Sequence, residues 1–356
     1  MKISFRNITL LILVTTIISC NGQVKNEKLS TDVMKITEVI KIPLPKNGFS
    51  NGYLDIDGTL WFTSNGGGIY HFDGKTCKNY TMKDGLSSNQ VFSIASDHKN
   101  NLWFGTQNGL VKYNRQQFEH IPLPYQDTTT GWIRTVYPTL SPNAAYALAT
   151  DNINNLWIGT GGAGVYCYDG KNFKSYLTEI GQKQIDSLYH NWIPFIRKDS
   201  KGNMWFASMT HGGVNQYDGK EFKQFLIKDG LSEDQIRTIY CDKTGKIWFG
   251  FNGNRNSGLT VYDGSSFKTY SVADGLCNKR IRAIFEDKNG NLWLGADLVN
   301  LCLFDGQKFS EYNYNGKTFS HVLFILGDLE DNIWFGGANG IWKYDGETVT
   351  EMTTNK

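Results

Sequence analysis

One tryptophan-centred motif recurs seven times along the 356-residue chain, and this repetition constrains the fold more than any other feature of the sequence. Successive marker tryptophans are 42, 54, 48, 43, 45 and 41 residues apart. The markers are Trp61, Trp103, Trp157, Trp205, Trp248, Trp293 and Trp334. Repeats of about 40–50 residues are typical of folds in which each unit buries its apolar surface against its neighbours.

Each repeat contains four short runs with the character of strands. In the clearest copy, the first run alternates between apolar and polar residues over Ile236–Tyr240, and the second holds Trp248. The third run ends at the Tyr-Asp-Gly of residues 262–264, and the fourth has the form F-x-x-[YF] over Phe267–Tyr270. Asp-Gly between two alternating runs predicts a tight hairpin, because both central residues of a type I′ turn need a positive φ.

The period and the strand pattern together predict the fold. No stretch with helical periodicity follows the first twenty residues. We therefore expect an all-β protein, a seven-bladed β-propeller with four-stranded antiparallel blades over residues 33–356. The run Ile36–Ile42 lies outside the seven copies, and we expect it to supply or reinforce the outermost strand of the last blade, where Thr348–Met352 is short.

The repeat is similar to that of a known family. Its pattern D-x-x-G-x-[LI]-W-[FIL]-G-T-x-x-G-L-x-x-[YF]-D-G, followed by F-x-x-[YF] and Asp-Gly-Leu, resembles the two-component-regulator propeller repeat over about residues 45–350. Trp-x-Gly occurs in five of the seven copies, and Asp-Gly-Leu occurs at 84–86, 229–231 and 274–276. In that family the propeller is usually the periplasmic sensor of a membrane histidine kinase, often in glycan-responsive systems. Because no further apolar span and no kinase segment follow, we expect the fold of the sensor without its signalling activity.

The first twenty residues resemble a bacterial lipoprotein signal. Two basic residues precede an eleven-residue, largely apolar stretch over Ile8–Ile18, which is too short for a membrane span of about 20 residues. The stretch ends in Ile-Ile-Ser-Cys, which resembles a lipobox. We expect a signal peptide over residues 1–19, a lipid on the sulfur of Cys20 as the only membrane anchor, a polar tether over residues 20–32, and a location in the cell envelope (outer membrane or periplasmic face). The alternative is a plain secretory signal in which Cys20 is incidental.

Charge and cysteine content argue against two classes of function. The chain has 36 Lys+Arg against 34 Asp+Glu, and removal of residues 1–19 leaves 34 of each. Nucleic-acid binding is not expected, because it needs clustered Lys and Arg to displace counter-ions. The five remaining cysteines form no C-x-x-C and occupy unrelated repeat positions, so we expect core residues rather than a disulfide framework or a zinc site. They are Cys77, Cys167, Cys241, Cys277 and Cys302.

Two short motifs are better explained as turns. Residues 159–164 satisfy G-x-G-x-x-G, but the dinucleotide fingerprint needs a following helix, and here the motif occupies the turn between the second and third strands. The Asp-rich hairpin at 287–291 resembles a calcium loop but lacks its further carboxylates and terminal Glu. We therefore expect no cofactor and no metal.

The positions that differ between repeats are where a specific function is expected, because the repeated positions have the same structural role in every blade. The first strand of each blade of a propeller lines the central channel. Residues thirteen and eleven positions before each marker tryptophan vary, whereas the intervening position is apolar in every copy. By the two-residue period of a strand, both variable positions face the channel mouth and the apolar one faces the core.

The variable positions predict a polar binding site at the channel mouth. The first-strand candidates are Gln90, Tyr146, Trp192, Gln235, Arg237, Arg280, Arg282 and His321. The two longest intervals place insertions on the same face, from which Trp132 and His190 are expected to reach over the mouth. Amides, guanidinium groups and aromatic rings are what a site for a sugar or another polar ligand uses. The alternative is that these side chains only hydrate the channel entrance.

Three functions fit this arrangement. The first is a non-enzymatic, monomeric, sensor-like propeller that binds a small polar ligand or oligosaccharide, or a membrane sensor or transport protein. The second is a lyase or hydrolase acting at the channel mouth, as in the seven-bladed, metal-assisted streptogramin lyases. The third is an assembly scaffold whose long loops dock a membrane partner. We favour the first and predict no catalytic residues, because the mouth carries few acids and no H-x-x-E-type spacing.

Replacing Cys20→Ala is expected to abolish lipidation, because the lipid is attached through the cysteine sulfur. A fatty-acid probe should label the parent protein and not the variant, and the variant should leave the membrane fraction or remain uncleaved. A variant that is still labelled and still held in the membrane would contradict the lipobox interpretation.

Overall fold

The computed structural model describes residues 41–124, 141, 144–178, 192–209, 212–253, 258–297 and 301–354. These residues form seven sheets of four strands, and each sheet takes four strands that are consecutive in sequence. Neighbouring strands pair in the antiparallel sense. The predicted seven-bladed β-propeller is therefore confirmed.

The blades follow one another along the chain. Blade one is β1 (Phe49–Leu54), β2 (Leu60–Ser64), β3 (Ile69–Phe72) and β4 (Cys77–Tyr80). Blade two is β5 (Val91–Ser96), β6 (Leu102–Thr106), β7 (Gly109–Tyr113) and β8 (Phe118–Ile121). Blade three is β9 (Ala145–Thr150), β10 (Leu156–Thr160), β11 (Val165–Tyr168) and β12 (Phe173–Tyr176). Blade four is β13 (Phe195–Lys198), β14 (Met204–Ala207), β15 (Val214–Tyr217) and β16 (Phe222–Phe225). Blade five is β17 (Ile236–Cys241), β18 (Ile247–Phe251), β19 (Leu259–Tyr262) and β20 (Phe267–Tyr270). Blade six is β21 (Ile281–Glu286), β22 (Leu292–Ala296), β23 (Cys302–Phe304) and β24 (Phe309–Glu311). Blade seven is β25 (Val322–Gly327), β26 (Ile333–Gly337), β27 (Gly340–Tyr344) and β28 (Val349–Glu351).

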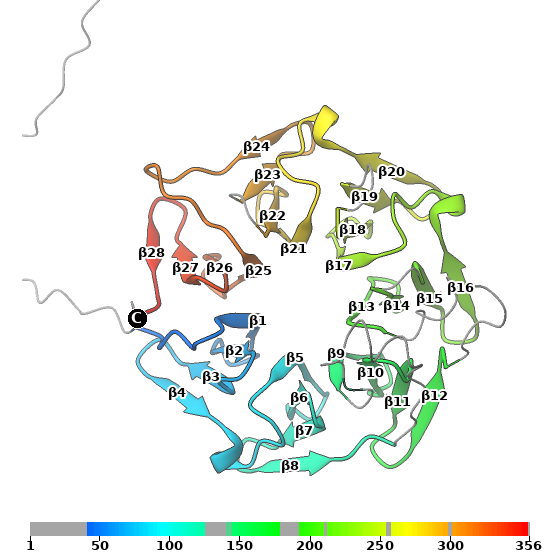
Figure 1. The fold of residues 1–356 in the computed structure, drawn as a ribbon, viewed down its shortest axis with the longest axis vertical. Helices are drawn as coiled ribbons and strands as arrows, with labels where there is room; N and C mark the ends of the chain where they lie inside the picture. Colours follow the sequence, from blue (N-terminus) through cyan, green and yellow to red (C-terminus); the bar gives the residue numbers. More distant parts are fainter. Residues whose placement is uncertain are drawn as a thin grey trace, which may run out of the picture. The chain divides into compact units, whose positions relative to one another are not determined.

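The seven sheets stand in a ring around a central axis (Figure 1). In each blade the first strand is innermost and the fourth strand lies at the rim. The inner wall of the ring therefore consists of β1, β5, β9, β13, β17, β21 and β25, as expected for the strands that carry the variable positions.

The Asp-Gly-Leu motif turns the chain from the rim of one blade toward the next blade. It closes three short 3₁₀ helices, η1 (Met82–Asp84), η3 (Ile227–Asp229) and η4 (Val272–Asp274). In the first, the carboxylate of Asp84 accepts the backbone N–H of Thr81 at 2.8 Å. Gly85 has a φ of 109°, a conformation that favours glycine, and Leu86 is buried beneath the turn.

Each marker tryptophan is buried and donates its indole N–H to an aspartate six residues earlier in the chain. The Nε1–Oδ2 distances range from 2.7 Å in the last blade to 3.1 Å in the first. The pairs are Trp61–Asp55, Trp103–Asp97, Trp157–Asp151, Trp205–Asp199, Trp248–Asp242, Trp293–Asp287 and Trp334–Asp328. The carboxylate also orders the hairpin, since Asp287 accepts the backbone N–H groups of Asn289 and Asn291 at 2.9 Å. The Asp-rich hairpins are turns, as predicted.

The glycine two residues after the marker tryptophan allows adjacent blades to approach closely. A Cβ atom at Gly159 would lie 2.0 Å from the carbonyl oxygen of Ile193 at the start of the next blade. At Gly105 it would lie 2.3 Å from the carbonyl oxygen of Ala145. The Trp-x-Gly motif therefore reflects the close contact between adjacent blades as well as the fold of a single blade.

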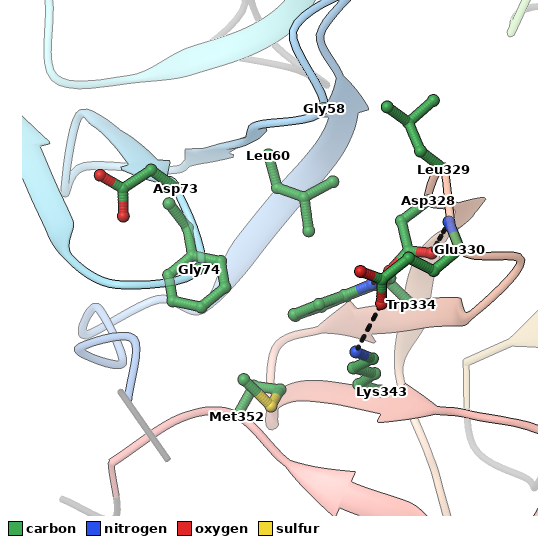
Figure 2. A pocket seen from close by; sticks show the side chains of 11 residues that line it. Gly58, Leu60, Asp73, Gly74, Asp328, Leu329, Glu330, Trp334, Lys343 and Met352 are labelled. Atoms are coloured by element: carbon green, nitrogen blue, oxygen red, sulfur yellow. Dashed lines mark hydrogen bonds and ion pairs between the residues drawn. The ribbon is translucent and has the colours of Figure 1, made fainter. Parts of the chain in front are cut away.

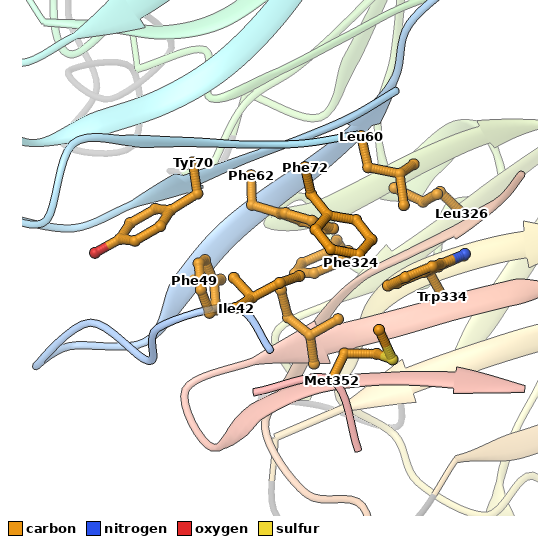
Figure 3. Packing of buried hydrophobic residues seen from close by; sticks show 11 residues of the cluster. Ile42, Phe49, Leu60, Phe62, Tyr70, Phe72, Phe324, Leu326, Trp334 and Met352 are labelled. Carbon is orange, nitrogen blue, oxygen red and sulfur yellow. The ribbon is translucent and has the colours of Figure 1, made fainter. Parts of the chain in front are cut away.

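The last blade packs against the first through a continuous apolar cluster (Figure 3). The ring centroids of Phe62 in blade one and Phe324 in blade seven are 5.7 Å apart. Those of Phe72 and Trp334 are 5.8 Å apart. Comparable clusters join the other adjacent blades, so the ring is held together by side-chain packing between sheets.

The chain segment before blade one reinforces the last blade. Ile42 forms a parallel bridge with Thr353, and its N–H donates to the carbonyl of Met352 at 2.7 Å. The four strands of blade seven all come from the C-terminal part of the chain. The N-terminal run therefore adds to the rim of this blade and does not replace one of its strands; its residues 36–40 lie outside the described residues.

The prediction that the cysteines form no disulfide is wrong for one pair. Cys277, in the loop that enters β21, is bonded to Cys302 on β23, with Cα atoms 5.8 Å apart. The equivalent residues of blade five are Ser232 and Thr260, whose hydroxyls lie 3.2 Å apart. The pair forms because the entry loop of a blade crosses its third strand, a contact that cysteine spacing alone does not reveal. Cys77, Cys167 and Cys241 are free and partly buried, as predicted.

Removing one marker tryptophan should destabilise the propeller strongly. Trp248→Ala is expected to lower the free energy of unfolding by about 3–5 kcal/mol, because it leaves a cavity between two blades. Trp248→Phe keeps most of the volume but leaves Asp242 without its indole donor, so a loss of about 1–3 kcal/mol is expected. Urea unfolding measures both values, and a Trp248→Phe variant as stable as the parent would contradict a role for the hydrogen bond.

Acid should destabilise the propeller through the same aspartates. Burial raises the pKa of Asp97, Asp287 and Asp328, but hydrogen bonds from Asn and Trp side chains and from backbone N–H groups outweigh burial, and each pKa lies below its ordinary value. Such carboxylates stabilise the fold above their unfolded-state pKa of about 3.9, and this stabilisation is lost as the pH falls through the folded-state pKa. The urea concentration at the unfolding midpoint should decrease as the pH is lowered below about 4. It should decrease less steeply for Asp287→Asn. A midpoint that is unchanged down to pH 3 would contradict this.

Candidate functional site

A cavity of about 370 Å³ lies on the central axis of the ring and is lined by the inner strand of every blade. The residue eleven positions before the marker tryptophan lines this cavity in six of the seven blades. These residues are Ser50, Phe92, Tyr146, Pro194, Arg282 and Leu323. The structure therefore gathers one of the two variable positions of the repeat around one space.

A β-bulge sets the position of this residue. In β21, Ile281 pairs with Ala296 and Ala283 pairs with Gly295, which leaves Arg282 outside the regular ladder. The same irregularity occurs at the equivalent place in β1, β5, β9, β17 and β25. A bulge of this kind re-aims one side chain, here toward the channel. The residues just before it are fully buried, as predicted: Phe49, Val91, Ala145, Ile193, Ile236, Ile281 and Val322.

Aromatic rings form one side of the cavity wall. Phe92 and Tyr146 are stacked with ring centroids 4.5 Å apart and an interplanar angle of 23°. Trp192 packs against Tyr146 at 5.9 Å, and its backbone bridges to Gly161 in the preceding blade. Burial raises the pKa of Tyr146 to about 12, so its hydroxyl is neutral and can donate a hydrogen bond at physiological pH.

Guanidinium groups and their partners lie on the side of blades five and six. Arg282 donates to the carboxylate of Asp297 at 2.6 Å, and both side chains are partly exposed. Arg237 donates from Nε to Asn252 Oδ1 at 2.9 Å, and the amide of Asn252 lies 3.4 Å from Gln235 Oε1. The side chains on this side are therefore held in fixed orientations by hydrogen bonds.

Sequence reasoning missed Asp297 and Asn252. Each lies four residues after a marker tryptophan, in the turn between the second and third strands. The residue at this position differs from blade to blade, as do the residues thirteen and eleven positions before the marker tryptophan. Comparing it across the seven repeats was the signal that could have found both residues.

Of the predicted residues that the structure describes, Tyr146 and Arg282 line the cavity, and the others lie outside its lining: Gln90, Trp192, Gln235, Arg237, Arg280 and His321. The backbone of Gln90 bridges to Asn65, and Arg280 is exposed. His321 has a φ of 57°, and its backbone N–H donates to the carbonyl of Asp297 at 2.8 Å. Trp132 and His190 lie outside the described residues.

The described residues contain neither a cluster suited to a metal ion nor a helix suited to a membrane. Within these ranges no group of three or more His, Cys, Asp or Glu is arranged to hold a metal ion. No helix of the described chain has the length and apolar character needed to cross a membrane.

Grooves at the blade junctions are a repeated feature of the fold. Figure 2 shows the groove between blades seven and one, with Leu60 and Asp73 of blade one on one side and Trp334 and the Lys343–Glu330 pair of blade seven on the other. A similar groove between blades five and six is lined by matching residues, including Leu292, Phe304 and Trp248. Because the same cleft recurs at equivalent positions, we attribute it to blade packing, and the central cavity is the better candidate for a specific site.

Comparison with known families agrees with the repeat analysis. The family described as "Two component regulator propeller" matches residues 85–108, 139–162, 230–253 and 275–297. Each matched segment contains the first strand of a blade and its marker tryptophan.

The chain is similar in sequence to proteins of two-component systems, and it is similar in fold alone to a lyase. A histidine kinase of Formosa agariphila is 25% identical over 273 residues, which are 73% of this chain and 19% of the kinase. The solved extracellular domain of a protein described as a hybrid two-component system of B. thetaiotaomicron is 26% identical, with a TM-score of 0.68 over 85% of this chain and 40% of that one. Virginiamycin B lyase from Staphylococcus aureus has a TM-score of 0.63 over 84% of this chain and 98% of the lyase.

These likenesses differ in what they support. The lyase is only 15% identical, so it shares the fold alone. The chain spans about a fifth of the kinase and less than half of the solved extracellular domain chain, so the activities of those whole proteins do not transfer with the match. What the chain shares with the two-component-regulator propeller family is the repeat, which matches in four of its seven blades, and the propeller fold.

Proposed function

We propose that this protein is a sensor-like binding module of the cell envelope, which binds a small polar ligand, such as a sugar, in the central cavity and does not transform it. The arrangement of Phe92 and Tyr146 on one side of the cavity and Arg282 on another carries this proposal. All three side chains occupy the bulged position of their strands.

The chemistry of these side chains suits a ring that carries hydroxyl groups. Stacked aromatic rings offer a flat apolar surface, and the neutral Tyr146 hydroxyl adds a donor at its edge. The Arg282 guanidinium is oriented by Asp297, so it can donate its remaining N–H groups without a large loss of side-chain entropy. Such a combination of apolar surface and a few oriented polar groups is typical of small-molecule sites.

The proposed cellular role is supported by the likeness to two-component-regulator propellers. The similar propeller of B. thetaiotaomicron is an extracellular domain, which supports an envelope location for this chain. Attachment through a lipid on Cys20 belongs to this proposal and is tested by the Cys20→Ala variant. Binding without catalysis is supported by the likeness to sensor propellers, although propellers of the same shape include a lyase.

Variants at the bulged positions should lose binding without losing the fold. An oligosaccharide array probed with the parent protein identifies the ligand, and Tyr146→Ala and Arg282→Ala should each weaken its binding about tenfold or more, equivalent to about 1.4 kcal/mol. Thermal unfolding should change little, because neither residue belongs to the repeated core.

The matched control is Lys279→Ala, which removes an exposed charge three residues before Arg282 and should bind as the parent does. If both cavity variants bind the ligand as tightly as the parent, the site is wrong.

A further inference from the structure

We propose that the ligand of the central cavity carries an oxyanion group, such as a carboxylate, and that Arg197 binds it. This inference rests on the proposal that the cavity is the binding site, and it adds the charge of the ligand and the residue that recognises it.

Arg197 belongs to the cavity and not to the repeated scaffold. It lies on β13, eight residues before Trp205, and lines the same cavity as Tyr146 and Arg282. The equivalent residues of the other blades are uncharged: Tyr53, Ala95, Ala149, Tyr240, Phe285 and Leu326. The fold therefore does not need a charge at this position, and blade four is the one that has it.

The guanidinium of Arg197 has unused donors. Its Nε donates to the carbonyl of Ile239 in the next blade at 3.3 Å, which accounts for one of the five N–H donors of an arginine. Among the described residues, no carboxylate lies within ion-pair distance of it. Arg282 and Arg115, by contrast, are each paired with an aspartate.

The cavity wall around the Arg197 guanidinium contributes no negative charge. Its described lining includes two arginines and no Asp or Glu, and the charge of one of them, Arg282, is offset by Asp297. The accessible surface of the remaining lining is more polar than apolar, and it is uncharged. A positive charge in a recess whose lining holds no carboxylate attracts an anion more strongly than the same charge on an open surface.

The side chain of Arg197 is accessible from the channel, and protein atoms around its guanidinium lower its pKa through burial. An anion that pairs with the guanidinium would stabilise its charged form, and a planar carboxylate can accept two parallel N–H bonds from it.

The distance along the channel between Arg197 and the level of Tyr146 and Arg282 indicates the length of the ligand. Arg197 lies three residues beyond Pro194, which directly precedes β13 and is equivalent in the repeat to Tyr146 and Arg282. Three residues of strand correspond to about 10 Å along the channel. A ligand of about two sugar rings could therefore stack on Tyr146 and place a terminal carboxylate at Arg197.

Two disaccharides that differ by one carboxylate test the inference. Cellobiouronic acid has a carboxylate where cellobiose has a hydroxymethyl group, and calorimetric titration at fixed ionic strength measures both affinities. The parent should bind the acid at least tenfold more tightly than the neutral sugar. Arg197→Gln should remove this preference, and Arg197→Lys should keep part of it.

Lys198→Gln is the matched control, since it removes the same charge from the next, exposed residue and should keep the preference. Arg197→Gln should melt at the same temperature as the parent or higher, because it removes a charge with no carboxylate partner. A marked fall in melting temperature would instead assign Arg197 a structural role and overturn the inference.

Other outcomes separate the two proposals. Equal affinity of the parent for both sugars, no binding of the acid at millimolar concentration, or a preference retained by Arg197→Gln would overturn the oxyanion site. Loss of the acid preference in Arg197→Gln, together with unchanged binding by Tyr146→Ala and Arg282→Ala, would support the oxyanion site and contradict the binding roles proposed for Tyr146 and Arg282.

Discussion

The hydrogen bond between the indole of each marker tryptophan and the aspartate six residues before it is the interaction on which the rest of the structure depends. It joins the turn of the first hairpin to the interior of the blade, so the ends of two strands and the core are fixed together. Because the aspartate also accepts backbone N–H groups, the same residue orders the turn and satisfies the buried indole. Seven copies of this unit make seven sheets of nearly the same shape.

Because the scaffold is fixed in this way, the residues of the inner strands that face the channel can differ from blade to blade. The position before the bulge is always buried and apolar, whereas the bulged residue is Ser50 in blade one, Tyr146 in blade three and Arg282 in blade six. Substitutions at the bulge change the channel without disturbing the packing between sheets. This separation of roles explains how one repeat can build both a stable ring and a specific cavity.

The ring is closed by contacts between parts of the chain that are far apart in sequence. Phe62 and Phe72 of the first blade pack on Phe324 and Trp334 of the last, and Ile42 adds a bridge at the rim. The Cys277–Cys302 disulfide adds a covalent link within blade six, at the place where blade five has a pair of hydroxyl groups. Closure and cross-linking therefore supplement the repeated core at individual blades.

The sequence by itself determined the number of blades, the strands of each blade and the buried face of each inner strand, because these depend on residues that are neighbours in the chain and repeat with a regular period. The tertiary structure alone decided which variable residues share the cavity. Strict alternation assigns Arg197 to the face opposite Pro194, and nothing near Arg282 in the sequence points to Asp297 as its partner. Bulges, loop crossings and contacts between blades shift side chains by distances that a local period does not encode. Tyr146 and Arg282 could therefore be predicted as channel residues, whereas Arg197, the pairing of Arg282 with Asp297 and the disulfide could not.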